Sequence, residues 1–200
     1  MRLLVLTDRR QSAAAGRDLA ETVAAIVAAG APTVIFREKD LPADERRALG
    51  ERVAEVCAAA GAQLTVASDP TLARMLGAGT VHLAGDDPWP AEDDLAVGRS
   101  CHSAGELADA DTHGAAYATV SPVFATPSKP GYGPPLGLVR LRALVAGTRV
   151  PIVALGGVGP DDVGVCLAAG ATGVAVMGAV MTAADPGAVV RELLDQEPVR

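Results

Sequence analysis

Eight short apolar runs, rich in β-branched residues, recur along the chain and are separated by segments of helix-forming residues. The runs lie at residues 3–7, 33–37, 64–67, 80–83, 97–101, 116–121, 151–155 and 173–177. Most are almost continuously apolar, which is typical of parallel strands covered on both faces. Strands that alternate with helices predict right-handed crossovers and a parallel sheet. Eight repeats in 200 residues therefore predict an α/β fold, a (β/α)₈ TIM barrel.

The segments between the runs have the composition and spacing of helices. They lie at residues 17–29, 43–60, 70–77, 103–113, 137–147, 160–169 and 185–196, and the stretch 84–96, rich in Asp and Pro, lacks a helical pattern. Asp69, Ser103 and Asp185 are predicted N-caps. No linker divides residues 1–200, so we expect one barrel domain. The alternative is a doubly wound open sheet, but its usual glycine fingerprint is absent from "LTDRRQS".

Charge and composition exclude several classes of partner. The formal net charge is −7 and the chain holds two Phe, two Tyr and one Trp, which disfavours binding to nucleic acid or to an anionic membrane. No apolar segment has the length of a membrane span or a secretory signal, so we expect a cytoplasmic protein. Cys57, Cys101 and Cys166 lack metal-ligand spacing and are predicted to be reduced structural thiols. Cys101, beside His102, is the alternative candidate for a nucleophile.

In a (β/α)₈ barrel the active site lies at the carboxyl ends of the strands. Arg37 and Lys39 are two residues apart at such an end, so their side chains leave the strand on the same face while Glu38 faces away. A pair of cations at the barrel mouth suits a phosphate or diphosphate. The alternative is an exposed ion pair with Glu38 or Asp40.

Two carboxylates follow neighbouring strands and would repel a diphosphate unless a metal lay between them. These are Asp69 and Asp87, and Asp86 is the alternative to the second. Mg²⁺ prefers one or two carboxylates, several waters and phosphate oxygens. The sequence therefore predicts a Mg²⁺ site, with helix capping by Asp69 and a solvated loop at Asp87 as the alternatives.

Small and hydroxyl residues follow the remaining strands. Gly156 and Gly157 after the seventh strand, with Gly178 and Ala179 after the eighth, allow backbone N–H groups to approach an anion, and loops seven and eight are the usual phosphate site of this fold. Ser68 and Ser100 lie at other strand ends. The stretch "SPVFATPSKPGYGPP" places Thr126, Ser128 and Lys129 among prolines and glycines, which predicts a lid over a bound anion. The alternative is a rigid surface crossing.

Together the stretches "FREKD", "ASD", "VHLAGDD", "VGRSCHS", "SPVFATPSK", "ALGGV" and "GVAVMGAVM" resemble thiamine phosphate synthase, in the superfamily shared with thiazole tautomerase. The resemblance implies a Mg²⁺-dependent barrel enzyme that joins hydroxymethylpyrimidine diphosphate to a thiazole phosphate. It implies three groups of site residues: Arg37, Lys39, Ser128 and Lys129 for the diphosphate; Asp69 and Asp87 for the metal; and Ser100, Thr126, Gly157 and Gly178 for orienting the substrates and binding the thiazole phosphate.

Several positions depart from the pattern of this family. Ile35 replaces a Gln, Ser68 an Asn, Gly85 a Gln and Gly178 a Ser, so several hydrogen bonds to the substrates are missing. A tautomerase-like isomerase, with His102 as its general base, and a non-catalytic binder of phosphate ligands are the alternatives. Against the tautomerase, Pro122 occupies the position of its catalytic His. The expected partners are phosphorylated pyrimidine and thiazole molecules, and the sequence leaves homo-oligomer formation open.

Overall fold

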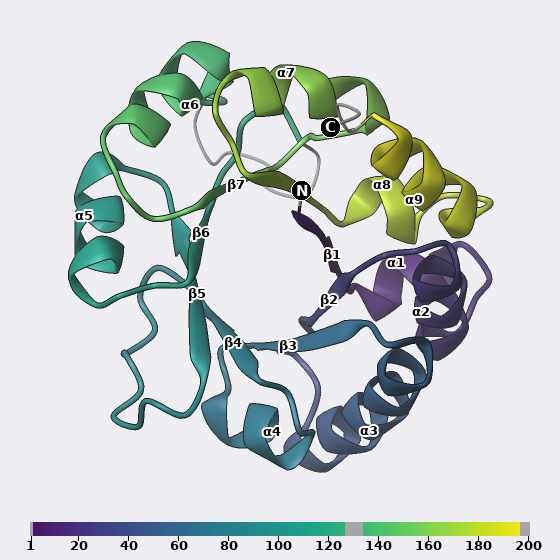
Figure 1. The fold of residues 1–200 in the computed structure, drawn as a ribbon. Coiled ribbons are helices and arrows are strands. Elements are labelled where there is room, and N and C mark those ends of the chain that lie inside the picture. Colours follow the sequence, from purple (N-terminus) through teal and green to yellow (C-terminus); the bar gives the residue numbers. More distant parts are fainter. Residues whose placement is uncertain (1, 127–133, 197–200) are drawn as a thin grey trace.

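The computed structural model describes residues 2–126 and 134–196. Its strands form a closed barrel in the order β1 to β8, and every neighbouring pair is parallel, including β1 with β8. The strands are β1 Arg2–Leu6, β2 Thr33–Phe36, β3 Gln63–Ala67, β4 Thr80–Leu83, β5 Ala96–Cys101, β6 Tyr117–Val120, β7 Ile152–Leu155 and β8 Gly173–Val176. Figure 1 looks along the barrel axis and shows the helices as an outer ring. The predicted (β/α)₈ barrel is confirmed, and the β1–β8 pairing excludes the open sheet.

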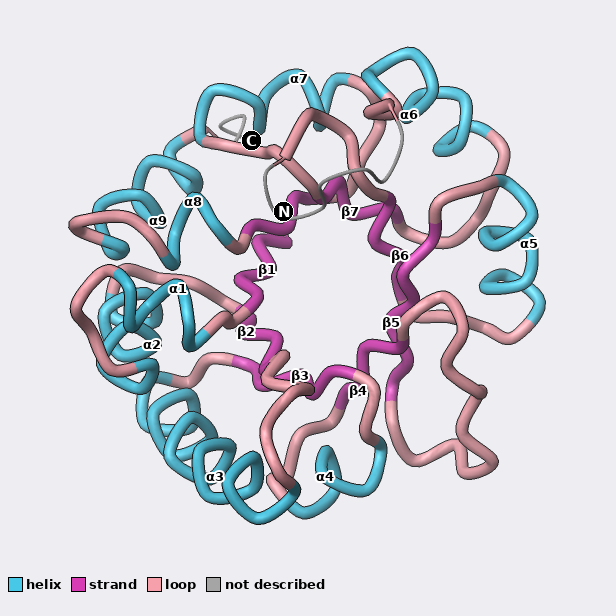
Figure 2. Tube along the Cα trace, turned by 180° about the vertical axis from the view of Figure 1, so that it is seen from behind, coloured by secondary structure: helices cyan, strands magenta, loops and turns pink. Residues whose placement is uncertain are grey.

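The helical segments follow the strands in turn, as Figure 2 shows from the opposite side. They are α1 Arg9–Ala14, α2 Leu19–Ala28, α3 Ala43–Ala60, α4 Pro70–Met75, α5 Ala104–Thr112, α6 Gly137–Ala146, the 3₁₀ turn η1 Pro160–Asp162, α7 Val163–Ala168, α8 Gly178–Met181 and α9 Pro186–Asp195. The predicted caps Asp69, Ser103 and Asp185 each accept a backbone N–H in the first turn of α4, α5 and α9. The short helices α1 and α8 were not predicted.

The core has two layers, as the alternation of side chains along a barrel strand requires. A large cluster lies between the strands and the helices, and includes Phe36, Val53 and Leu141. A smaller cluster fills the barrel interior and comprises Leu4, Leu6, Ile35, Ala67, Tyr117, Val153 and Ala175. Because this cluster and buried polar side chains such as His82 and Thr119 fill the interior, the barrel is a packed core.

The connection between β4 and β5 has no helix, as predicted. The buried Arg99 side chain holds it instead, donating from Nη1 to the carbonyl of Asp87 at 2.6 Å and from Nη2 to that of Gly85 at 2.8 Å. The Arg99 guanidinium also stacks over Trp89, 4.8 Å from the ring centroid. A charged side chain thus orders a loop that has little apolar surface of its own. No helix in residues 2–126 and 134–196 is long and apolar enough to cross a membrane.

Candidate active site

Because all the strands are parallel, the residues that follow them gather at one end of the barrel. Arg37 and Lys39 follow β2 and both side chains are exposed there, whereas Glu38 between them is buried. The backbone N–H of Arg37 donates to the Thr7 hydroxyl at 2.9 Å, which joins the ends of β1 and β2. The structure therefore presents both predicted cations at the barrel mouth.

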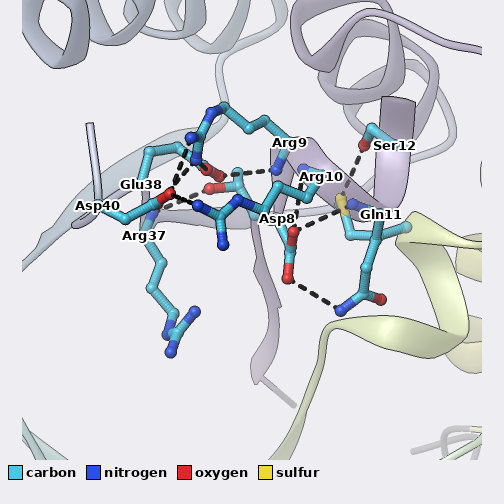
Figure 3. A network of polar contacts seen from close by, with 10 residues as sticks. Asp8, Arg9, Arg10, Gln11, Ser12, Arg37, Glu38 and Asp40 are labelled. Atoms are coloured by element: carbon cyan, nitrogen blue, oxygen red, sulfur yellow. Dashed lines mark hydrogen bonds and ion pairs between the residues drawn. The ribbon is translucent and has the colours of Figure 1, made fainter. Parts of the chain in front are cut away.

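The acidic neighbours of these cations are engaged elsewhere. Glu38 forms an ion pair with Arg9, and Asp40 forms ion pairs with Arg9 and Arg10 of α1. Figure 3 shows the Arg37 side chain extending away from this cluster. Among the residues that the structure describes, Arg37 forms no ion pair with either carboxylate, so the alternative of an exposed ion pair is wrong for Arg37.

Lys39 connects the β2 end electrostatically to the other strands. Partial withdrawal from water lowers the pKa of Lys39, although much of the side chain is exposed, and the nearby Arg37 and Arg46 lower it further. The carboxylate of Asp87 acts in the opposite direction. Lys39 is therefore close enough to interact with both these cations and the acidic loop after β4, an arrangement that suits an anion bound together with a metal.

Asp87 and Ser68 meet at the ends of β3 and β4. The Ser68 hydroxyl donates to Asp87 Oδ2, and the backbone N–H of Ala84 donates to the same oxygen at 2.6 Å. Although partial burial opposes it, these hydrogen bonds lower the pKa of Asp87, and the carboxyl is ionised. Asp86, the alternative at this position, is exposed.

Asp69 is the N-cap of α4, accepting the N–H of Leu72 on Oδ1 at 2.8 Å. Its Oδ2 pairs with Arg46 Nη1 at 3.0 Å, and Arg46 Nη2 also donates to the carbonyl of Ala67 at 2.7 Å. The capping role considered for Asp69 is thus present. A carboxylate oxygen has more than one lone pair, so capping does not by itself prevent metal ligation.

The donor set at this edge fits Mg²⁺. Asp69, Asp87 and the Ser68 hydroxyl, which donates to Asp87, provide hard oxygen donors after β3 and β4, and two of these groups are charged. No group of three or more His, Cys, Asp or Glu side chains able to hold a metal converges in the described part of the chain. Mg²⁺ needs no such group, because waters and substrate phosphate oxygens complete its octahedron.

A buried network supports Ser100 from inside the barrel. His82 Nε2 lies 3.0 Å from Ser100 Oγ, and His82 Nδ1 lies 3.0 Å from the hydroxyl of Tyr117. Thr119 Oγ1 is 3.4 Å from His82 Nε2. Burial, with a smaller contribution from Lys39, lowers the pKa of His82 to about 4. His82 is therefore a neutral hydrogen-bonding partner that fixes the Ser100 side chain.

This buried imidazole predicts a pH-dependent stability. The pKa of His82 is about 6.5 in the unfolded chain and about 4 in the native state. The stability that depends on neutral His82 is therefore fully present above pH 6.5 and is lost as the pH falls from 6.5 to 4. We expect His82 to account for about 3 kcal/mol of this loss. Urea unfolding of the wild type and of His82→Gln at pH values between 6.5 and 4 measures this loss of stability. His113→Gln, which replaces an exposed His, should retain the wild-type slope, and an equal slope in His82→Gln would contradict the assignment.

The loops after β6 and β7 pack against each other. Gly157 has φ +69°, and a Cβ there would lie 2.4 Å from the carbonyl oxygen of Ala125; Gly156 has φ +93° and a Cβ would lie 2.7 Å from Pro122 Cα. The backbone N–H of Phe124 donates to the carbonyl of Gly156 at 2.9 Å. Glycine is thus required on steric grounds in addition to any role in anion binding.

The structure describes only some of the other predicted residues of these loops. Thr126 is half-buried and lies at the end of the described segment, whereas Ser128, Lys129 and the predicted lid around them fall within 127–133, outside the described residues. Gly178 begins α8, directly after β8, and Ala179 is exposed there.

The alternative catalytic groups have other partners. His102 Nδ1 lies 2.6 Å from the carbonyl of Ser121, which ties the end of β5 to that of β6. Cys101 is buried, and burial, with a further contribution from Glu106, raises the pKa of its thiol to about 12. Cys57 and Cys166 are likewise buried and form no disulfide. The prediction of reduced structural thiols is confirmed.

Sequence reasoning did not identify Arg9, Arg46 or Arg99, which hold Glu38, Asp69 and the Asp87 loop respectively. Each of these arginines is distant in sequence from the group it holds, and no local pattern marks it. The contact of His82 with Ser100 was not predicted either. A stronger signal was available: between the apolar Val81 and Leu83, a polar residue of β4 alternates toward the barrel interior.

Several of the proteins that this chain resembles, in sequence and in structure, are named for thiamine biosynthesis or thiamine phosphate synthesis. The family model described as thiamine monophosphate synthase matches residues 3–180. A thiamine biosynthesis bifunctional protein of Symbiobacterium thermophilum is 40% identical over 182 residues, which are 88% of this chain and 38% of that longer protein. The thiamine-phosphate synthase of Moorella thermoacetica is 39% identical over 184 residues, covering 89% of this chain and 88% of the relative. A thiamine phosphate pyrophosphorylase structure from Pyrococcus furiosus superposes with a TM-score of 0.86 and 29% identity, covering 98% and 94% of the two chains.

Proposed function

Because the chain belongs to the thiamine monophosphate synthase family, we propose that it transfers the hydroxymethylpyrimidine group from its diphosphate to a thiazole phosphate. The products are thiamine phosphate and diphosphate. One observation supports this most directly: Arg37 and Lys39 are presented at the same end of the barrel as the carboxylates of Asp69 and Asp87. Such an arrangement suits a diphosphate with its metal.

The diphosphate is assigned to the cations that follow β2 and β6. The Arg37 guanidinium can hold two phosphate oxygens, and Lys39 adds a compact charge. Ser128 and Lys129 complete this group by resemblance to the family. Asp69 and Asp87 would hold Mg²⁺, which the family generally uses and which neutralises charge developing on the leaving diphosphate when bound.

The reaction breaks the carbon–oxygen bond to the diphosphate and forms a bond from the same carbon to the thiazole nitrogen. Charge develops on the leaving oxygens, so fixed cations at the rim stabilise the transition state more than the ground state. Ser100, held by His82, and Thr126 are assigned to orienting the substrates. Backbone N–H groups at Gly156, Gly157, Gly178 and Ala179 are assigned to the thiazole phosphate.

The positions that depart from the family pattern affect how tightly the pyrimidine substrate binds. Ile35 is buried in the barrel interior and offers no hydrogen bond where other members have Gln. Ser68 retains a polar contact through its hydroxyl to Asp87. We therefore expect weaker binding of the pyrimidine, with the charge-based part of the site intact. The cytoplasmic location stays a prediction.

The two phosphorylated substrates mixed with the protein and Mg²⁺ test the function. We expect thiamine phosphate and diphosphate in equal amounts, no product with EDTA, and recovery when Mg²⁺ is added in excess. Aromatisation of a carboxythiazole phosphate without metal would instead indicate the isomerase. Saturable binding of either substrate without turnover would indicate a non-catalytic binder.

A further inference from the structure

Arg9 is the first residue of α1 and contacts two carboxylates of the segment after β2. Its backbone N–H donates to Glu38 Oε1 at 3.1 Å, and its Nη1 donates to Glu38 Oε2 at 3.2 Å. Its guanidinium also holds Asp40 through two hydrogen bonds, Nη1 to Oδ1 at 2.7 Å and Nη2 to Oδ2 at 2.8 Å. Figure 3 shows these contacts converging on one arginine, with the Arg37 side chain directed elsewhere.

The two carboxylates alternate in sequence with the two cations assigned to the diphosphate. Glu38 lies between Arg37 and Lys39, and Asp40 follows directly. Glu38 is 2% exposed, so its charge must be compensated by a partner within the protein. Among the described residues, its ion pair is with Arg9. Hydrogen bonding to Arg9 lowers the pKa of Asp40 to about 2, so this carboxylate also stays charged.

Without Arg9, Asp40 would keep its ion pair with Arg10, whereas Glu38 would lose its ion-pair partner among the described residues and has Arg37 and Lys39 beside it in the sequence. A buried carboxylate that has lost its partner either takes up a proton or draws in another cation. An arginine engaged by Glu38 has fewer N–H groups to offer a phosphate, and an unpaired negative charge beside the site repels a polyanion.

We propose that Arg9 is a positioning residue that keeps Arg37 and Lys39 available for the substrate diphosphate by occupying the carboxylates of Glu38 and Asp40. This inference rests on the proposed function. In the proposed reaction no group of α1 contacts a substrate. The inference gives α1 a role in the affinity for the pyrimidine diphosphate but not in the affinity for the thiazole phosphate. This role differs from that of a purely structural arginine, because the effect of Arg9 acts through charge and is limited to the affinity for the diphosphate.

Calorimetric titration with inorganic diphosphate, on the full chain with and without Mg²⁺, tests the proposal. We expect Arg9→Met to bind diphosphate at least about 10-fold more weakly than the wild type does. Arg10→Met is the matched control: it removes the same charge from the next residue, but the Arg10 side chain is 74% exposed, and within residues 2–126 and 134–196 it pairs with Asp40 and not with Glu38. We expect its affinity to stay within about twofold of the wild type.

The double variant Arg9→Met/Glu38→Gln separates charge from fold. It restores the wild-type net charge and leaves no buried carboxylate in need of a partner, so we expect affinity within about threefold of the wild type. If Arg9→Met does not fold, Arg9→Lys replaces it; this variant keeps a charge but loses the two-pronged contact with Asp40, and should show a smaller loss in the same direction.

Steady-state kinetics give a second readout. In Arg9→Met the KM for the pyrimidine diphosphate should rise, while the KM for the thiazole phosphate stays unchanged. Diphosphate affinity equal to that of the wild type in folded Arg9→Met or Arg9→Lys would overturn the inference and leave the proposed function intact. A folded double variant that binds no better than Arg9→Met would overturn it too. Failure of the wild type to bind diphosphate would overturn both.

Discussion

Replacement of Asp87 by Asn is expected to lower kcat/KM on the order of 10²–10³-fold, the loss typical of removing one electrostatic contact to a transition state. The amide has nearly the same shape, but it brings no negative charge opposite Lys39 and ligates Mg²⁺ weakly. Its nitrogen would also face the N–H of Ala84 if it replaced Oδ2, the oxygen that accepts this hydrogen bond. Initial rates over a Mg²⁺ titration measure the effect, and the Mg²⁺ concentration for half-maximal rate should rise.

The adjacent Asp86 provides the control for this change. Asp86→Asn removes the same charge one residue earlier, from an exposed side chain, and we expect its kcat/KM to remain within about threefold of the wild type. Equal losses in both variants would show that the acidic loop acts through its net charge alone. A loss confined to Asp86→Asn would transfer the metal assignment to that residue.

Replacement of Gly157 by Ala is expected to have the largest effect on stability together with a loss of activity. The residue has φ +69°, and its Cβ would lie 2.4 Å from the Ala125 carbonyl oxygen and 2.8 Å from Phe124 Cβ. A left-handed Ala costs about 1–2 kcal/mol and the overlap with backbone about 1–3 kcal/mol more. The melting temperature should fall by roughly 5–15 °C. Relief of the overlap would separate loops six and seven, so the KM for the thiazole phosphate should rise.

Gly164 of α7 is the matched control for Gly157. A Cβ at Gly164 has no atom within 4 Å, and the residue is helical. Gly164→Ala should therefore stabilise the protein by about 0.5–1 kcal/mol, because Ala loses less conformational entropy in a helix. Thermal unfolding of the two variants should move in opposite directions. A melting temperature of Gly157→Ala equal to that of the wild type would contradict the tight packing of loops six and seven.

The succession of elements could be predicted because each strand and most helices carry their signal locally. The run at 64–67 became β3, Gln63–Ala67, and the segment at 43–60 became α3 with the same bounds. α8 could not be predicted in the same way, because four residues are too few to display a helical period. α1 is as short as α4, but it lacks a proline in its first turn such as Pro70 of α4. Along α3 the apolar residues Leu49, Val53 and Val56 recur at helical spacing and face the core: Val53 is fully buried, and Leu49 and Val56 are partly buried against it.

The candidate site could be predicted as a set of strand ends, but not as a set of contacts. Arg37 and Lys39 were identified from their spacing and their place after a strand, and their exposure in the structure agrees with this. The partner of Glu38 was not predicted: the sequence suggested its own neighbours, and the structure gives Arg9, 29 residues earlier. Similarly, Asp69 was considered as either a cap or a ligand, and its pairing with Arg46 depends on how α3 packs beside β3.

The sequence by itself determined the barrel and which residues lie at its functional end, because the spacing of apolar residues defines parallel strands whose carboxyl ends must share one rim. The tertiary structure alone decided which charges remain available at that rim. Ion pairs form between groups that the closed barrel brings together from distant segments, and the packing of α1 against the β2 end assigns Arg9 to Glu38 and leaves Arg37 directed away from both.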